Sequence, residues 1–344
     1  MRLTNILRAG LTLSLLAGAT LLAGGAARSA TLDAVKQRGI LACGVSRGVL
    51  GFSMPSAAGE WSGFDVDFCR ALAAAIFDDP GKVKFVPLGA AERFQALRSG
   101  TVDILSRNSS WTMSWEADLG VTFAAVTYYD GQGFMVPRAR NIQTATELGG
   151  SKVCVETGTT SELNVADYFK ANGMSLQLHL VTNSADALKA YDAGECGVMT
   201  TDVSALHGER LKLAKPADHV ILADVISKEP LGPVVRNDDP QWINIVKWTH
   251  FAMVNAEELG VSSKTLDAAL QSTKPSVRRL VGLDGVAAEK FGLSKDWAAR
   301  IIRRVGNYAE VYERNLGTKT PLGIPRGLNE LWTAGGIMYA PPVR

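Results

Sequence analysis

The segment SRNSSWTMSWE (106–116) gathers polar and aromatic side chains directly after the apolar stretch VDIL (102–105). Hydroxyl and amide groups bind polar ligands through hydrogen bonds, a guanidinium binds anions, and indole rings bury a large area against whatever they cover. A Ser/Thr-rich turn would explain the hydroxyls, but it would not explain two tryptophans in the same segment. We therefore expect a ligand site that uses Ser109, Ser110 and Trp115, with Trp115 as a wall of the cleft.

Two further polar clusters also follow apolar stretches. GTTSELN (158–164) begins a predicted helix, in which Thr159 and Glu162 fit a capping box. The free N–H groups at such a helix start also bind anions. TTD (200–202) ends with Asp202, which either caps the next helix or holds a ligand ammonium by a charge-assisted hydrogen bond. Because both clusters stand at predicted strand ends, we favour a ligand role for each over capping alone.

An internal repeat places these clusters at equivalent positions. RFQALRSGTVDILSRN (93–108) aligns without a gap with ALKAYDAGECGVMTTD (187–202). Each segment has a helix pattern, a glycine where the helix ends, a short apolar strand and a polar cluster. We interpret the match as a duplication rather than a chance similarity between two α/β stretches.

The repeat extends upstream and predicts the fold class. Each copy has the order strand, helix, strand, helix, strand, which predicts a doubly wound, mostly parallel α/β sheet with right-handed crossovers. Ligands of such sheets bind beyond the carboxyl ends of the strands, so the two copies would face one cleft. YYDGQG (128–133) and KEPLGP (228–233) read as two chain crossings between the lobes, and the chain after the second crossing reads as helical.

Residues 1–30 have the pattern of a signal peptide, with a basic start, an apolar core and small residues before the expected cleavage. A membrane anchor is the alternative, but the apolar core is short and rich in Gly and Ala. Without this leader, basic and acidic residues are nearly equal in number, which does not suggest nucleic-acid binding. We expect no metal and no cofactor, because no zinc-ligand spacing, phosphate loop or dinucleotide motif is present. Disulfides are permitted in an exported chain, and four cysteines allow three connectivities.

Several long segments resemble one known family. They are GFDVDFCRALAAAIF (63–77), RFQALRSGTVDILSRN, YYDGQGFMV (128–136), GTTSELNVADYF (158–169) and ISKEPLGPVVRNDD (226–239). The chain resembles the general L-amino acid ABC transporter substrate-binding proteins, within the periplasmic polar amino-acid-binding family (solute-binding protein family 3).

The resemblance implies a type II periplasmic binding protein with two lobes. Lobe 1 would be residues 31–131 plus 231–275, lobe 2 residues 132–230, and residues 276–344 a helical C-terminal extension packed on the lobes. The lobes would close on an amino acid or related small solute by hinge motion. The protein would be a periplasmic monomer without catalytic activity, and it would touch the membrane only through the permease of the transporter.

The resemblance also implies roles for single residues. The hydroxyl of Ser110 would hold the ligand carboxylate, Thr160 its main-chain groups, and Asp202 its ammonium. An arginine of the family, which would fork onto the carboxylate, is replaced by Trp115. Three explanations are open: Arg107 supplies the charge, the helix start near Thr160 binds more of the anion, or the ligand is not a standard L-amino acid and stacks on Trp115.

Disulfide pairs within each lobe follow from the strand order that the resemblance implies. Cys154 and Cys196 would join neighbouring strands, and Cys43 would join Cys69 on the adjacent helix. Two other functions stay open. One is a periplasmic enzyme of the cyclohexadienyl dehydratase type, with Asp202 and Glu156 as the candidate acid or base. The other is a sensing module that reports its ligand to a membrane receptor.

Overall fold

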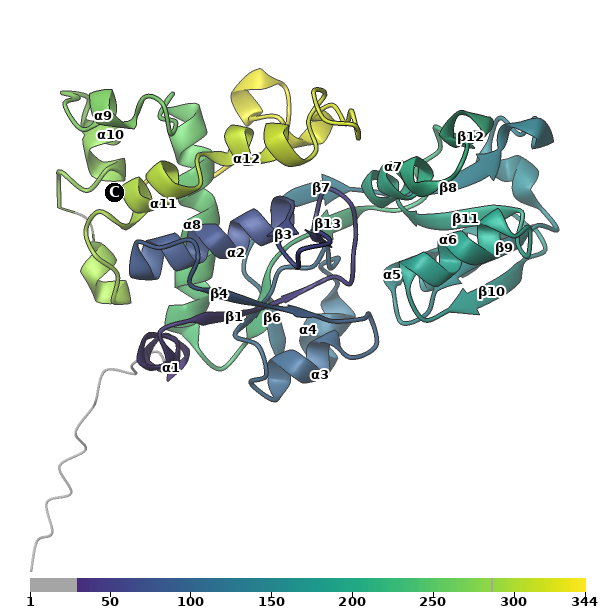
Figure 1. Cartoon of the computed structure of the whole chain (residues 1–344), viewed down its shortest axis with the longest axis horizontal. Coiled ribbons are helices and arrows are strands. Elements are labelled where there is room, and N and C mark those ends of the chain that lie inside the picture. Colours follow the sequence, from purple (N-terminus) through teal and green to yellow (C-terminus); the bar gives the residue numbers. More distant parts are fainter. Residues whose placement is uncertain (1–29, 286) are drawn as a thin grey trace, which may run out of the picture.

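The computed structural model describes residues 30–285 and 287–344, and its chain forms two α/β lobes (Figure 1). The predicted signal peptide lies outside the described residues, apart from its last residue, Ala30. No helix in the described part of the chain is both long enough and apolar enough to span a membrane.

The sheet of the first lobe has five strands in the order β4-β1-β5-β14-β6. Their bounds are β1 (Leu41–Val45), β4 (Val83–Pro87), β5 (Ile104–Leu105), β6 (Val121–Phe123) and β14 (Val234–Arg236). β1 pairs in parallel with β4 and β5, whereas β14 is antiparallel to β5 and β6. The antiparallel strand is the one that returns from the second lobe, so the sheet is mostly parallel, as predicted.

The sheet of the second lobe also has five strands, in the order β10-β9-β11-β8-β12. Its strands are β8 (Gln132–Pro137), β9 (Lys152–Glu156), β10 (Gln177–Val181), β11 (Val198–Asp202) and β12 (His219–Ile221). β9 is parallel to β10 and β11, and β8 is antiparallel to β11 and β12. The three strands of each repeat copy lie in the same order, β4-β1-β5 in one sheet and β10-β9-β11 in the other, which supports the duplication inferred from the sequence.

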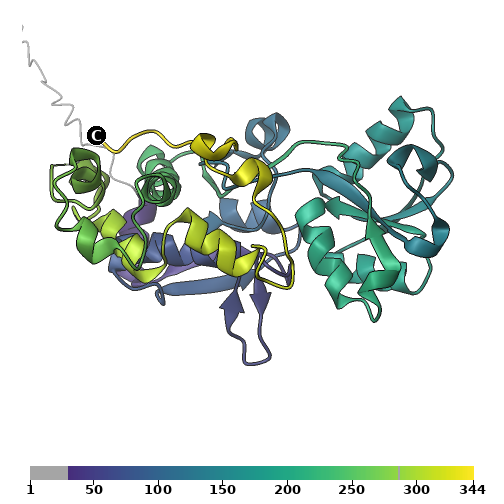
Figure 2. The same ribbon diagram turned by 90° about the horizontal axis from the view of Figure 1, so that it is seen from above.

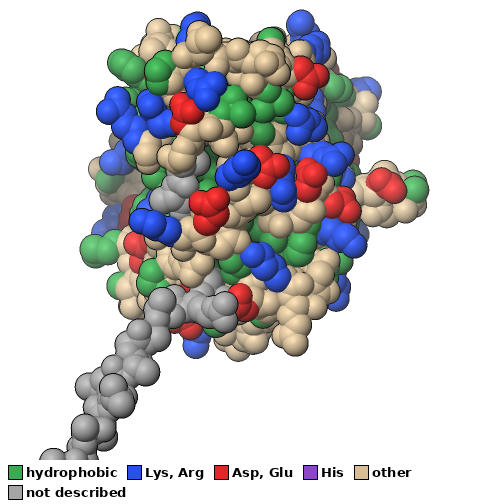
Figure 3. Space-filling model, turned by 90° about the vertical axis from the view of Figure 1, so that its left-hand side faces the viewer, with side chains coloured by type: hydrophobic (Ala, Val, Ile, Leu, Met, Phe, Trp, Pro, Cys, Tyr) green, Lys and Arg blue, Asp and Glu red, His purple; other side chains and the backbone are tan. Residues whose placement is uncertain are grey.

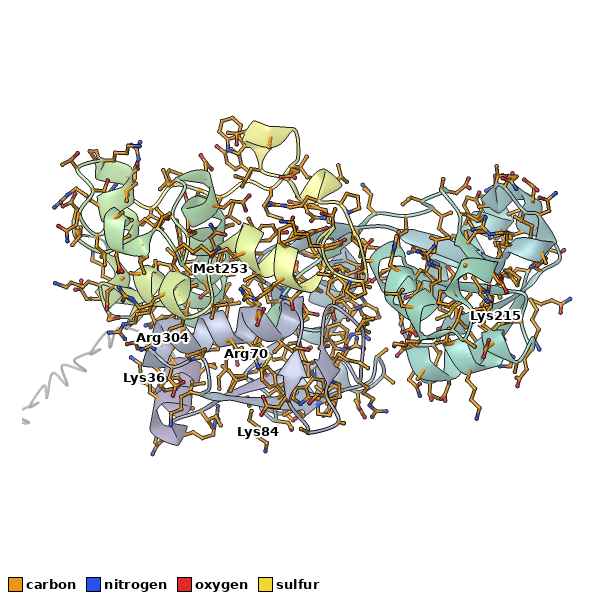
Figure 4. All side chains as sticks on the ribbon, turned by 45° about the horizontal axis from the view of Figure 1, so that its top comes forward. Lys36, Arg70, Lys84, Lys215, Met253 and Arg304 are labelled. Atoms are coloured by element: carbon orange, nitrogen blue, oxygen red, sulfur yellow. A yellow bond between two sulfur atoms is a disulfide. The ribbon has the colours of Figure 1, made fainter. Side chains whose placement is uncertain are left out.

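Helices cover both faces of each sheet (Figure 1). They are α1 (Ala30–Arg38), α2 (Phe64–Phe77), α3 (Arg93–Arg98), α4 (Met113–Leu119), α5 (Thr160–Ala171), α6 (Ser184–Asp192), α7 (Val203–Lys212), α8 (Pro240–Glu258), α9 (Leu266–Ala269), α10 (Pro275–Leu280), α11 (Trp297–Arg304) and α12 (Tyr308–Asn315). An apolar face of α8 is buried in the first lobe and includes Trp242 and Met253. Figure 4 shows Met253 inside that lobe, whereas Lys84 and Lys215 point to solvent.

Two short strands connect the lobes where the sequence predicted the chain crossings. β7 (Tyr128–Asp130) pairs antiparallel with β13 (Glu229–Leu231), so that Tyr129 lies opposite Pro230. Figure 2 shows both crossings between the lobes, and it also shows the hairpin of β2 (Met54–Pro55) and β3 (Trp61–Ser62) projecting from the first lobe.

The C-terminal part packs on α2 and α8 and reaches the first crossing strand. Arg326 pairs with Glu257 at 2.8 Å. Asn329 accepts a hydrogen bond from the backbone N–H of Tyr129 at 2.7 Å and donates one to its carbonyl at 3.0 Å. On the face of the molecule that is turned away from the second lobe, acidic and basic side chains are interspersed (Figure 3).

Both predicted disulfides are present. Cys43 on β1 is bonded to Cys69 on α2, and Cys154 on β9 is bonded to Cys196, which lies just before β11. β9 and β11 are neighbours in the sheet, as the predicted strand order required. Each bond lies within one lobe and does not cross between them.

Candidate functional site

A cavity between the lobes is lined by side chains from both of them. It is open to solvent, and the empty space within it and at its mouth together is about 530 Å³. Its lining residues are Val49, Arg93, Arg107, Asn108, Ser109, Ser110, Glu156, Thr159, Thr160, Ser161, Ser184, Thr201, Asp202 and Ala205. Six of the seven residues predicted for the site are among them. The polar clusters at the strand ends of the two copies therefore meet in one place.

Ser110 and Thr160 join the two lobes at the cavity. The hydroxyl of Thr160, at the start of α5, lies 3.4 Å from that of Ser110 and donates a hydrogen bond of 2.9 Å to Oε2 of Glu229. Thr159 next to it caps α5 by accepting from the N–H of Glu162. Thr159 thus acts as the predicted cap while it also lines the cavity.

A buried carboxylate shapes the loop that carries Ser109 and Ser110. Oδ2 of Asp65 accepts a hydrogen bond from the backbone N–H of Asn108 at 2.9 Å, and Oδ1 accepts one from the hydroxyl of Ser106 at 3.3 Å. Burial raises the pKa of Asp65 to about 7, against the effect of these hydrogen bonds. Asn108 adopts a left-handed conformation with φ of 39°, which asparagine tolerates better than most residues. The loop places Ser109 and Ser110 at the cavity.

Asp202 faces the cavity and does not cap a helix with its side chain. It occupies the N-cap position of α7 but makes no side-chain cap hydrogen bond, and it is buried. Burial raises the pKa of Asp202 well above its ordinary value, and the nearby carboxylates of Asp130 and Glu229 raise it further. A buried carboxylate among other carboxylates is a favourable site for an ammonium group.

Two buried arginines supply positive charge to the same cavity. Arg107 follows β5, and burial lowers its pKa, whereas the charges of Glu156, Asp65 and Asp202 raise it. Arg93, the first residue of α3, is only 3% exposed, and burial lowers its pKa to about 9. The sequence analysis missed Arg93, because a basic residue at a helix start normally points into solvent.

Several polar atoms at the cavity have no hydrogen-bond partner among the residues that the structure describes. They are Nε of Arg93, Nε of Arg107, Oδ1 of Asn108 and the hydroxyl of Ser109. Buried polar groups are nearly always paired in folded proteins, and leaving one unpaired costs about 1–3 kcal/mol. Both donors and acceptors are left over, so the cavity is suited to a ligand that carries both.

Trp115 does not line the cavity, contrary to our expectation of a cleft wall. It lies in the first turn of α4, and its ring packs on Phe94 with centroids 5.2 Å apart. The guanidinium carbon of Arg93 lies 5.7 Å from the centre of the same indole. The physical reason is the helix register of α4, which turns the indole toward α3 and places it behind Arg93.

Two lobes joined by two crossing strands, with oppositely charged groups in the cavity between them, define the class of two-lobe solute-binding proteins. Residues 41–265 match the family described as bacterial extracellular solute-binding proteins, family 3, and the chain belongs to this family.

Similar proteins cover nearly the whole chain. The chain is 51% identical to the general L-amino acid-binding periplasmic protein AapJ of Rhizobium johnstonii, over 96% of this chain and 98% of that protein. It is 50% identical to the glutamate/glutamine/aspartate/asparagine-binding protein BztA of Rhodobacter capsulatus, over 94% and 96%. Among solved structures, a periplasmic binding protein from Brucella ovis with glutathione bound is 51% identical, with a TM-score of 0.89 over 91% and 99%.

Proposed function

We propose that the chain is the periplasmic substrate-binding component of an amino-acid ABC uptake transporter. It captures an amino acid or a related small solute between its lobes and delivers it to the permease. The observation that carries this proposal is the cavity in which buried Arg93 and Arg107 of the first lobe face buried Asp202 of the second. The relatives near 50% identity are named as binding proteins, which favours binding over the enzymatic alternative.

The ligand is held by its α-amino acid head. Asp202 accepts hydrogen bonds from the ammonium, because it is buried beside further carboxylates. Ser109 and Ser110 donate to the carboxylate, and the buried Arg93 and Arg107 supply positive charge to the cavity. Thr160 binds main-chain groups from the opposite lobe, where its hydroxyl already lies near that of Ser110. Zwitterions with such a head satisfy both the donors and the acceptors that the cavity leaves unpartnered.

The shape of the site allows ligands to differ in the part beyond the α-amino acid head, which is called the tail below. A second cavity adjoins the first and shares Val49, Arg107, Glu156 and Ser184 with it. The ligands in the names of the relatives, from amino acids to glutathione, share the head group and differ in length. We propose that the head fixes the ligand and that the tail extends toward this second cavity.

Delivery to the transporter uses hinge motion about the two crossing strands. We retain the division into lobe 1 (31–131 plus 231–275), lobe 2 (132–230) and the extension (276–344), because β7 and β13 lie at its borders. The protein works as a monomer in the periplasm, and its membrane contact is the permease.

Titration calorimetry on protein that has been unfolded and refolded to remove co-purified ligand tests the proposal. The panel is the set of common L-amino acids, glutathione, and D-glutamine as a control. We expect micromolar or tighter binding of at least one L-compound that carries a free amino acid head, and no heat from D-glutamine. No binding by any member of the panel would contradict the proposal, and turnover of prephenate or arogenate would favour the enzyme.

A further inference from the structure

The cavity contains a buried cation that is not matched by an acid in contact with it. Nη1 of Arg93 donates to the carbonyl of Ala90 at 2.7 Å and to that of Gly158 at 3.4 Å. Both acceptors are uncharged, and no ion pair within 4 Å joins Arg93 to an acid in residues 30–285 or 287–344. A buried charge is costly unless an opposite charge accompanies it.

Arg107 likewise has no ion pair within 4 Å in the described part of the chain, and its Nε is also unpartnered, but more acids lie near it. Three buried or half-buried acids, Asp65, Glu156 and Asp202, stabilise the charge of Arg107 through space. For Arg93 the stabilising acid is Glu156 alone, and the positive charge of Arg107 opposes it. Both arginines therefore lack an acid in contact, and Arg93 has the fewer acids near it.

Two aromatic rings hold the guanidinium of Arg93 in place. Its central carbon lies 4.5 Å from the ring centre of Phe94 and 5.7 Å from that of Trp115. Aromatic faces stabilise a guanidinium and leave its N–H edge free to form paired hydrogen bonds. Nε of Arg93 is buried and has no partner in the described part of the chain. A planar donor edge fixed in this way is suited to a carboxylate.

We propose that Arg93 binds the ligand carboxylate and that Phe94 and Trp115 hold its guanidinium in position for this purpose. The inference rests on the proposed function and names a further residue of its site. It also accounts for Trp115. The positive charge that an arginine would supply at this position comes instead from Arg93 on α3. The hydrogen bond to Gly158 reaches the second lobe, so Arg93 contacts both the ligand and the opposite lobe when the lobes are together.

The test compares L-glutamine with L-glutamine α-amide, which lacks only the carboxylate charge, by calorimetry on the mature protein. Arg93→Met lowers the affinity for L-glutamine about 100-fold and leaves the affinity for the amide unchanged. Arg93→Lys has an intermediate effect because the charge stays while the planar fork is lost. Trp115→Ala costs about 10-fold, and Trp115→Phe less, because phenylalanine keeps an aromatic face.

The matched control is Arg98→Met, which removes the same charge from an exposed position of the same helix and leaves both affinities unchanged. If Arg93→Met retained the preference for L-glutamine over the amide while Arg107→Met abolished it, the carboxylate would belong to Arg107 and the inference would be overturned. A lower melting temperature with equal losses for both compounds would show a purely structural role. Wild-type protein that binds no L-amino acid would overturn the proposed function, and this inference with it.

Discussion

Replacing Asp202 by asparagine separates ligand binding from stability. The side chain is buried and makes no cap hydrogen bond, so asparagine keeps its size without disturbing α7. Truncating one partner of a buried, hydrogen-bonded charge pair costs about 2–5 kcal/mol. At 25 °C this corresponds to a loss of affinity between about 30-fold and several thousand-fold. We therefore expect Asp202→Asn to bind L-glutamine at least about 30-fold more weakly than wild type.

The same substitution stabilises the ligand-free protein. Burial, together with the charges of Asp130 and Glu229, raises the pKa of Asp202, so the folded state holds its proton more tightly than the unfolded chain does. The stability contributed by this group is present below the ordinary pKa of aspartate, about 4, and is lost as the pH rises through the folded-state pKa. Asparagine carries no charge, so its advantage over aspartate grows with pH across this window.

Two measurements check both halves of this prediction. Calorimetry with L-glutamine gives the affinity, and urea unfolding of ligand-free protein at pH values between about 4 and 8 gives the stability. Asp167→Asn on the exposed face of α5 is the control, because it removes the same charge from a side chain that is exposed to solvent. An affinity of Asp202→Asn within about threefold of wild type would refute the assignment of Asp202 to the ammonium.

Three further predictions concern the site and its support. Arg107→Met lowers the melting temperature as well as the affinity, because it leaves three acids without their cation; an unchanged melting temperature would argue against this charge balance. Removing the second-lobe disulfide in a Cys154→Ala, Cys196→Ala variant costs about 4 kcal/mol in the chain-entropy description of its loop. Urea unfolding measures this loss, and wild type in reductant, where Cys43–Cys69 is reduced as well, should lose more. Asn329→Ala removes both hydrogen bonds to the backbone of Tyr129 and costs about 1–3 kcal/mol, whereas Asn172→Ala on the surface has a smaller effect; equal unfolding midpoints would contradict the role of Asn329 in fixing β7.

The sequence predicted the fold because both copies of the repeat predict the same order of secondary-structure elements. A helix that ends at glycine, followed by a short strand and a polar cluster, appears at 93–108 and again at 187–202. Parallel strands bring their carboxyl ends to one edge of a sheet, so two copies of this pattern suffice to predict that Ser110 and Asp202 line one cavity. The disulfide pairs were predicted from the strand order that the family resemblance implies, and both are present.

The sequence did not predict the groups that reach the cavity from other directions. Asp65 lies near the start of α2, and Arg93 begins α3, where charged residues are common at any helix end. Asp130 and Glu229 lie on the crossing strands, whose position depends on how the lobes dock. Trp115 was misplaced for a related reason, since one residue of helix register decides whether an indole faces the ligand or lies behind an arginine. The direction in which these side chains point depends on tertiary packing, so no local pattern in the sequence reveals it.

The distribution of charge over the two lobes links binding to closure. The first lobe brings Arg93 and Arg107 to the cavity, and the second lobe brings Asp202. In the described part of the chain, Nε of Arg93, Nε of Arg107, Oδ1 of Asn108 and the hydroxyl of Ser109 are buried without a partner, which opposes closure of the empty lobes. In the site proposed above, a zwitterion presents its carboxylate to one lobe and its ammonium to the other, so it gains contacts that exist only when the lobes are closed. A ligand shifts a conformational equilibrium by its difference in affinity for the two states. A zwitterion that bridges the lobes therefore drives closure, whereas a simple amine or carboxylate engages one lobe and leaves the other end of the cavity unsatisfied.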